Sequence, residues 1–378
     1  MLATPLAGPP SPQPCVFVDS ALPPSTDVVV IGGGVIGLSS AWRLLQVGLS
    51  VVVVDPAPAS GASFVAGGML GATAETTFAE AGSADRHLSA RAEWDPFLRE
   101  LSEELDRPLP YASTSTILVA GNRSDLAEIE HVAKFQRELD LRVNAVGREE
   151  LDRLVPGLGR TLRQGFHLVD DAAVDNRMIL QALLDAVQHR GGVICQASAE
   201  ALHQDGGQYC VDTSAGKVQA PNVLIATGAA PAIPSSVEIP TIHPVAGVIL
   251  RLTPRKSALT IATTIRAVIN GRSCYLVPRP DGGITLGATS VERGYDLSVP
   301  AGEVHQLLDD ARLVFPSLDD FALKDVEVGL RPTTADHHPI VELLQPGLAV
   351  ALGHYRNGFL LAPATAKRVA ELMGDVVK

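Results

Sequence analysis

The chain is short of basic residues: 30 Lys and Arg stand against 42 Asp and Glu, a formal net charge of −12 over 378 residues. Proteins bind nucleic acids and anionic membranes through clustered Lys and Arg, so this charge balance disfavours both as main partners. The chain also lacks any run of about 18 uninterrupted apolar residues, the length that a spanning helix requires. We therefore expect a protein that contacts neither nucleic acid nor membrane.

Cysteine is scarce as well, with four in the chain and no C-x-x-C pair. Cys15, Cys195, Cys210 and Cys274 lie far apart, which indicates reduced thiols and neither a disulfide framework nor a zinc site. The first 26 residues contain no Lys or Arg and many Pro, so they lack the basic start and apolar core of a secretory signal. They predict a disordered extension, 1–26, on a cytoplasmic protein.

The remaining composition, with 46% hydrophobic residues and 34 Gly, is ordinary for an α/β enzyme. Residues 27–55, DVVVIGGGVIGLSSAWRLLQVGLSVVVVD, predict a β-α-β unit with G-x-G-x-x-G directly after the first strand. Gly32 makes the tight turn, Gly34 admits a pyrophosphate, and Gly37 lets helix and strand pack closely. Asp55 ends the second strand, where a carboxylate can accept both ribose hydroxyls. The unit predicts dinucleotide binding, with a glycine-rich structural turn as the alternative.

This unit alone does not separate NAD from FAD. Farther along, NVLIATGAAP (222–231) is an apolar strand that ends in Ala-Thr-Gly, which resembles the second signature of two-dinucleotide flavoproteins. A second G-x-G-x-x-G and a redox C-x-x-C are both absent, which disfavours the disulfide reductases of the same broad fold. FAD is therefore favoured over NAD.

Four further segments carry a family resemblance: AGGMLGATAE (66–75), CYLVPRPDGGITLGATS (274–290), GLRPTTADHHP (329–339) and LGHYRNGFLLAPAT (352–365). With the N-terminal unit they resemble the D-amino-acid oxidase superfamily and, within it, the glycine oxidases, flavoenzymes of thiamine thiazole biosynthesis. The resemblance runs in matching order from about residue 27 to the C-terminus.

The resemblance implies an α/β fold with a Rossmann-like, doubly wound FAD domain and a second, antiparallel-sheet substrate domain. Both domains are expected to be discontinuous. The FAD domain is expected from 27–75, 155–240 and 320–378, and the substrate domain from 76–154 and 241–319.

Arg331 stands between an apolar strand and a Pro, where its permanent charge must find an anion or reach solvent. Its planar fork matches a carboxylate, and a salt bridge to a protein acid is the competing interpretation. The resemblance assigns Arg331 and the Tyr275 hydroxyl to the substrate carboxylate and places Arg356 in the substrate cavity; a core tyrosine and a surface arginine are the alternatives. Ser290 is smaller and more polar than the Met that the family often has there, so the resemblance does not define the shape of the substrate pocket. Adjacent His337-His338 point apart, so we predict no metal.

Two segments are expected to pass close to the flavin. Small residues in the loop after the second strand let backbone approach a planar ligand, although a mobile surface loop would have the same composition. The last helix, from about 359 to 372, would direct its partially positive start at the flavin pyrimidine end and stabilise the reduced form. The predicted cofactor contacts are Gly32, Gly34, Val35, Ile36, Gly37, Asp55, Ala62, Ser63, Gly67, Gly68, Met69, Ala199, Gly228, Gly353, His354, Tyr355, Asn357, Gly358, Phe359 and Leu360.

By this resemblance the chain binds FAD, non-covalently because 329–334 contain no Cys, and oxidises glycine or a small D-amino acid. The products would be an imine, hydrolysed to a 2-oxo acid and ammonia, and hydrogen peroxide from O2. A D-amino-acid or sarcosine oxidase, a dehydrogenase that reduces a quinone, and a non-catalytic flavin-binding subunit are the alternatives. The carboxylate-binding pair disfavours the last of these. A homo-oligomer is compatible with the sequence.

Overall fold

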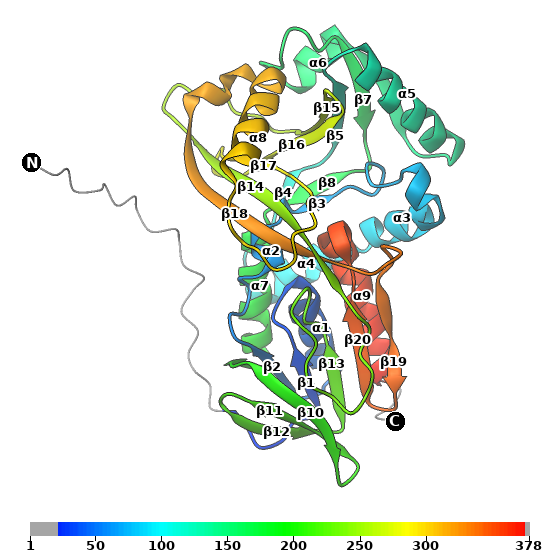
Figure 1. Ribbon diagram of the computed structural model, residues 1–378, viewed down its shortest axis with the longest axis vertical. Coiled ribbons are helices and arrows are strands. Elements are labelled where there is room, and N and C mark those ends of the chain that lie inside the picture. Colours follow the sequence, from blue (N-terminus) through cyan, green and yellow to red (C-terminus); the bar gives the residue numbers. More distant parts are fainter. Residues whose placement is uncertain (1–21, 375–378) are drawn as a thin grey trace, which may run out of the picture.

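The structure, a computed structural model, describes residues 22–374, with the side chains of 79–81 excepted (Figure 1). A six-stranded sheet with the order β19-β20-β13-β1-β2-β9 forms the lower part of the molecule in this view. Its strands are parallel except for β19, which pairs antiparallel with β20. Their bounds are β1 Val28–Ile31, β2 Val51–Asp55, β9 Val193–Gln196, β13 Asn222–Ile225, β19 Ile340–Gln345 and β20 Leu348–Leu352.

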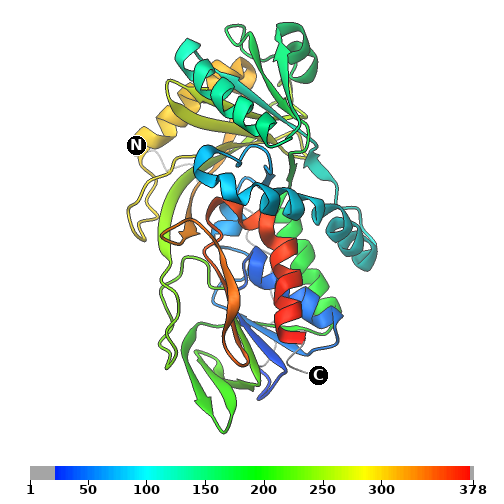
Figure 2. The same cartoon turned by 90° about the vertical axis from the view of Figure 1, so that its right-hand side faces the viewer.

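Both faces of this sheet are covered, which explains why β1 and β2 read as continuous apolar runs. Val28 and Val30 face one core and Val29 and Ile31 the other, as the period of two requires. Helices cover the first face: α1 (Val35–Gln46), α7 (Asn176–His189) and α9 (Gly358–Gly374). A three-stranded antiparallel sheet covers the second: β10 (Ala199–Asp205), β11 (Gln208–Thr213) and β12 (Gly216–Ala220). Figure 2 shows α9, in red, beside the orange hairpin of β19 and β20.

An eight-stranded sheet forms the upper part of the molecule, with the order β18-β14-β17-β16-β15-β5-β7-β6. All neighbours in it are antiparallel except β15 and β5. Helices α8 (Ala301–Val314), α5 (Arg123–Glu138) and α6 (Arg148–Leu154) pack against it. The strands are β5 Thr116–Ala120, β6 Val143–Gly147, β7 Gln164–Leu168, β14 His243–Pro254, β15 Thr264–Ile269, β16 Arg272–Pro278, β17 Ile284–Gly287 and β18 Phe321–Thr333.

Short elements join the two large sheets. A three-stranded sheet, β3-β8-β4, lies between them and receives the loop that follows β2 (Figure 1). The remaining elements are α2 Ala62–Val65, β3 Met69–Leu70, η1 Phe78–Ser83, α3 Ala84–Ala92, α4 Trp94–Leu105, β4 Tyr111–Ser113, β8 Ala172–Val174, η2 Pro316–Asp320 and η3 Tyr355–Asn357. Among residues 22–374 no helix is long and apolar enough to cross a membrane.

The α/β fold with one parallel and one largely antiparallel sheet matches the expectation, but the domain ranges stay a prediction. Strand β7 lies within 155–240 and β18 within 320–378, ranges expected for the FAD domain, yet both strands pair in the eight-stranded sheet. Residues 1–21 of the expected disordered extension lie outside the described residues. The Thr26 N–H donates to Gln219 O and the Gln219 N–H to Pro24 O, both at 3.0 Å, so Pro24 and Thr26 belong to the folded part and the expected boundary at residue 26 is wrong.

Candidate active site

The turn from β1 into α1 needs glycine at the positions that the sequence motif marks. Gly32 has φ +115°, and a Cβ there would lie 2.2 Å from Ala226 O. A Cβ on Gly37 would lie 1.9 Å from Gly32 O, so helix and strand touch at this point. At Gly34, which caps α1, the nearest neighbour is Ser63 Oγ at 3.3 Å. The turn is thus close-packed on its inner side, while Gly34 and Ile36 at the start of the helix are partly exposed, as a phosphate-binding turn requires.

Two side chains hold this turn in place. Asp55 Oδ2 accepts a hydrogen bond from the Gly33 N–H at 2.6 Å, and Ser63 Oγ accepts one from the Val35 N–H at 3.1 Å. Burial raises the pKa of Asp55, while the bonds from Gly33 and Ala57 lower it. Asp55 therefore lies at the end of β2, directly beside the turn expected to bind phosphate, where a ribose would be expected.

The carboxyl ends of four parallel strands meet at one edge of the six-stranded sheet. Gly32 follows β1, Asp55 ends β2, Gly228 follows β13 and Gly353 follows β20, so segments far apart in the sequence converge there. Ala199 lies nearby, because Asp55 is the register partner of Gln196 and its carbonyl accepts the Ala197 N–H at 3.2 Å. A dinucleotide lying along this edge would contact all of these segments.

The start of α9 contributes backbone and not side chains to this edge. Phe359 and Leu360 are buried in the core, and their carbonyls each accept the Trp94 Nε1–H at 3.1 Å. Any cofactor contact of these two residues is therefore through their N–H groups. His354 is also buried, with Nε2 3.0 Å from Thr365 Oγ1, and burial lowers its pKa to about 4, so it is neutral at neutral pH.

The loop before β3 passes against the predicted substrate residues. A Cβ on Gly67 would lie 3.1 Å from the Tyr275 ring, and one on Gly68, with φ +70°, would lie 2.2 Å from Val174 O. Arg279 Nη2 donates to Gly67 O at 2.8 Å and Nη1 to Val174 O at 2.9 Å. Buried Arg279 thereby fixes the path of the loop whose small residues were expected to face the flavin.

Tyr275 lies on β16 opposite Gly287 of β17, and a Cβ on Gly287 would lie 2.4 Å from the Tyr275 hydroxyl oxygen. Burial raises the pKa of Tyr275, while the nearby charge of Arg331 lowers it. Because the net shift is upward, the hydroxyl stays protonated at neutral pH and can donate a hydrogen bond. The predicted hairpin is confirmed, with β16 and β17 joined through Arg279 N–H to Gly283 O at 2.9 Å.

Arg331 lies on β18 beside β14, and its guanidinium covers Gly247: a Cβ there would lie 2.5 Å from Nη1 and Nη2. Nη1 donates to Thr289 O at 3.0 Å. Arg331 is half-buried, and within the described part of the chain no carboxylate forms an ion pair with it. The alternative interpretation of Arg331, a salt bridge to a protein acid, is therefore not borne out among the described residues.

Arg356 has a different environment from Arg331. Its Nε lies 3.3 Å from Glu75 Oε2, and 41% of its side chain is exposed. Glu75 is buried and also pairs with Arg266 Nη1 at 2.7 Å. Burial would raise the pKa of Glu75, but the charges of Arg266 and Arg356 outweigh it and hold that pKa at about 2. Arg356 thus pairs with an ionised carboxylate that it shares with Arg266. Arg331 has no carboxylate partner among the described residues, so it is better suited to anchor a substrate anion.

The sequence interpretation missed Arg266, and it did not predict that Glu75 pairs with Arg266 and Arg356. Arg266 on β15 is the register partner of Tyr275, so both side chains point to the same face of the sheet. A Cβ on Gly71 would lie 3.4 Å from Arg266 Nη1, and Asp171, whose pKa burial raises to about 6, lies beside the same glycine. The available signal was an arginine inside the apolar strand pattern of residues 264–269.

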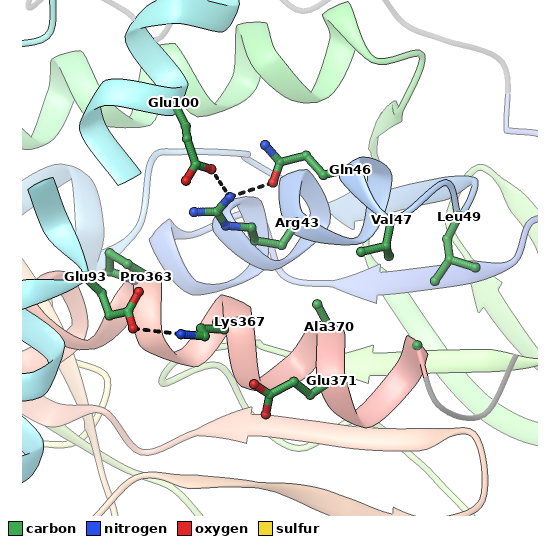
Figure 3. A pocket seen from close by; sticks show the side chains of 11 residues that line it. Arg43, Gln46, Val47, Leu49, Glu93, Glu100, Pro363, Lys367, Ala370 and Glu371 are labelled. Atoms are coloured by element: carbon green, nitrogen blue, oxygen red, sulfur yellow. Dashed lines mark hydrogen bonds and ion pairs between the residues drawn. The ribbon is translucent and has the colours of Figure 1, made fainter. Parts of the chain in front are cut away.

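A groove of about 650 Å³ lies between α1, α4 and α9 (Figure 3). Two ion pairs cross it, Arg43 with Glu100 and Lys367 with Glu93. None of the residues predicted for cofactor or substrate lines this groove, so it is separate from the candidate active site.

Comparison with known proteins gives a consistent set of relatives. The family model described as DAO, FAD dependent oxidoreductase, matches residues 27–372. A bifunctional ThiO/ThiG protein from a Nostoc species is 32% identical over 92% of this chain and 52% of its own length, so the chain spans about half of that relative. A glycine oxidase from Geobacillus kaustophilus is 29% identical over 92% of both chains. The crystal structure of glycine oxidase from that organism superimposes with a TM-score of 0.83, covering 93% of this chain and 95% of its own.

Proposed function

Since the chain belongs to the DAO family of FAD-dependent oxidoreductases, we propose that it oxidises glycine, with FAD as cofactor and O2 as electron acceptor. The balanced reaction takes glycine, O2 and water to a 2-oxo acid, ammonia and hydrogen peroxide. The names of the ThiO/ThiG and glycine oxidase relatives support this choice and suggest that the imine or its product supplies thiamine thiazole synthesis. A cytoplasmic location and a homo-oligomer remain predictions.

The observation that carries the proposal is a half-buried arginine without a carboxylate partner among the described residues. Arg331 needs an anion, and Tyr275 beside it offers a neutral hydroxyl donor. Together they can hold a small carboxylate through charge-assisted and neutral hydrogen bonds. A flavin-binding subunit without turnover would have no use for such a pair, so the non-catalytic alternative is disfavoured.

The cofactor cradle fits a flavin dinucleotide. Gly32 and Gly68 each have a positive φ. Because Gly67 has no side chain, the loop can pass close to the Tyr275 ring. Bound FAD would supply the two-electron acceptor, as flavins do. The part of this chain is to hold the substrate: Arg331 and Tyr275 fix the carboxylate so that the Cα–H bond has one orientation. We assign no side chain as the base that removes the amine proton.

A peroxide assay with glycine, sarcosine and a panel of D-amino acids tests the substrate assignment. We expect turnover with glycine, slower turnover with small D-amino acids, and no use of NAD. Small D-amino acids and sarcosine are the second candidates. Ser290, where the family often has Met, is exposed in the structure. Fast oxidation of D-phenylalanine without measurable glycine activity would contradict the substrate and leave the reaction class intact.

The flavin is expected to be non-covalent. Residues 329–334 contain no cysteine, and the described cysteines, Cys195, Cys210 and Cys274, are all buried. Cys274 neighbours Tyr275 in sequence but packs into the core of the eight-stranded sheet, on the other face of β16. After acid precipitation the yellow colour should remain in the supernatant as FAD; a yellow pellet would refute the prediction.

Gly247→Ala should weaken glycine binding although residue 247 is no donor. The added Cβ would occupy the space of the Arg331 guanidinium, 2.5 Å away, and displace the end of that side chain. We expect the KM for glycine to rise by about tenfold, since a misplacement of about 1 Å at a reacting site can cost that much or more. Gly302→Ala, where a Cβ would meet nothing within 4 Å, is the matched control. An unchanged KM in Gly247→Ala would argue against Arg331 as the anchor.

A further inference from the structure

The hairpin of β10 and β11 carries three side chains that can each bind a metal ion: His203, Cys210 and Asp212. Cys210 is the register partner of His203, and Asp212 lies two residues farther along β11. Register partners and residues two apart point to the same face of an antiparallel pair, so all three share one face. Their ligand atoms lie within 4.8 Å of one another. Asp212 Oδ2 is 3.8 Å from His203 Nδ1, and Asp212 Oδ1 is 4.0 Å from Cys210 Sγ.

The opposite face of the hairpin fixes this arrangement. Leu202 and Val211 are buried against the six-stranded sheet, together with Val218 of β12. A slip of one residue in the pairing would expose these side chains, so the hydrophobic core holds the register that brings the three ligands together. The set is therefore preorganised by the fold. Its ligands come from two strands, with six residues between His203 and Cys210, which is why no zinc-type spacing appears in the sequence.

We propose that His203, Cys210 and Asp212 form a binding site for a thiophilic divalent cation such as Zn²⁺, with the fourth position taken by water. An imidazole, a thiolate and a carboxylate are all ligands that Zn²⁺ accepts, and tetrahedral sites with three protein ligands are common. The thiolate and imidazole favour Zn²⁺ over Mg²⁺ or Ca²⁺, which prefer all-oxygen ligand sets.

Two features of the hairpin oppose binding and can be overcome by a metal. Lys217 Nζ lies 2.9 Å from Asp212 Oδ1, but 69% of the lysine side chain is exposed and it can turn towards water. Burial raises the pKa of the Cys210 thiol, and the charge of Asp212 adds to this effect. Binding would therefore break the S–H bond, form the metal–sulfur bond and release one proton to solvent.

The site is independent of the proposed oxidation. In Figure 1 the hairpin lies at the lower end of the molecule, whereas β16 and β17, which carry Tyr275 and its neighbour Gly287, lie in the upper sheet. The ion would join β10 to β11 and stabilise the strand that begins at Ala199, near the end of β2.

The test uses the full-length, FAD-loaded protein and ZnCl2. Equilibrium dialysis followed by metal counting should give one Zn²⁺ per chain, and X-ray absorption should show one sulfur ligand at about 2.3 Å. Cys210→Ser and His203→Ala should each weaken binding by at least about tenfold, the lower end of what even an outer-shell change costs. Lys217→Met should tighten binding by up to about fivefold, because it removes a competing surface ion pair. Cys15→Ser, which removes a thiol outside the hairpin, should leave Zn²⁺ binding unchanged.

If Cys210→Ser fails to fold, Lys217→Met still tests the site, because Lys217 is a surface residue and its replacement should tighten Zn²⁺ binding. Absence of bound Zn²⁺, absence of a sulfur ligand, or equal affinity in the parent, His203→Ala and Lys217→Met would each overturn it.

Discussion

Arg331→Ala should weaken capture of glycine, read as kcat/KM, by about tenfold to a hundredfold or more. The variant loses charge-assisted hydrogen bonds worth about 1.5–3 kcal/mol each, and about 1.4 kcal/mol corresponds to a factor of ten. Arg331→Lys should recover only part of the loss, because an ammonium cannot reproduce the planar two-bond fork. FAD should stay bound in both variants, since the phosphate turn at Gly32–Gly37 belongs to the other sheet.

Arg356→Ala is the informative comparison, because the Arg356 charge is already paired with Glu75. We expect its effect on kcat/KM to be milder than that of Arg331→Ala. Arg312→Ala, on the exposed side of α8, should have no effect. Steady-state kinetics of the four variants decide the matter. If Arg331→Ala turns over glycine like the parent while Arg356→Ala does not, the anchor is the other arginine.

Gly37→Ala should weaken the affinity of the protein for FAD by about tenfold to a hundredfold. The added Cβ would lie 1.9 Å from Gly32 O and 3.0 Å from Gly32 C, both backbone atoms that cannot rotate away. Overpacking of this kind costs about 1–3 kcal/mol, and here α1 must move away from the turn that would hold the pyrophosphate.

FAD titration of the apoprotein, followed by flavin fluorescence, measures the loss, and circular dichroism checks that the variant is folded. Gly61→Ala is the control, because a Cβ there would meet nothing within 4 Å. Gly34→Ala, with its Cβ 3.3 Å from Ser63 Oγ, should fall between the two. Equal FAD affinity in Gly37→Ala and Gly61→Ala would show that close helix–strand packing is not needed.

Patterns of short range were sufficient to predict much of the fold. The apolar runs at 28–31 and 51–54, the glycine motif and the turn at 280–282 each contain their own signal, and the structure confirms the strands, α1 and the hairpin. The convergence of Gly32, Asp55, Gly228 and Gly353 also follows from the rule that parallel strands end at one edge.

What could not be predicted depends on contacts between distant segments. The pairing of Arg266 with Glu75 joins residues 191 positions apart, and the pairing of Arg356 with Glu75 joins residues 281 positions apart, so no local pattern contains either. Similarly, the apolar pattern of β7 and β18 fits a strand in either large sheet, because alternation specifies which face is buried but not which neighbour the strand pairs with.

Strand β18 has a consequence for the choice between substrates. It pairs with β14 along its whole length, carries Arg331 near its end, and is bridged at Thr333 to His354, at the turn that leads into α9. The arginine that we propose as the carboxylate anchor and the segment expected beside the flavin are thus connected through backbone pairing. This connection would fix the position of the carboxylate relative to the flavin, so that the carbon bonded directly to the carboxylate is the one placed to react. A β-amino acid such as β-alanine, whose amine-bearing carbon lies one bond farther from the carboxylate, would be held out of register.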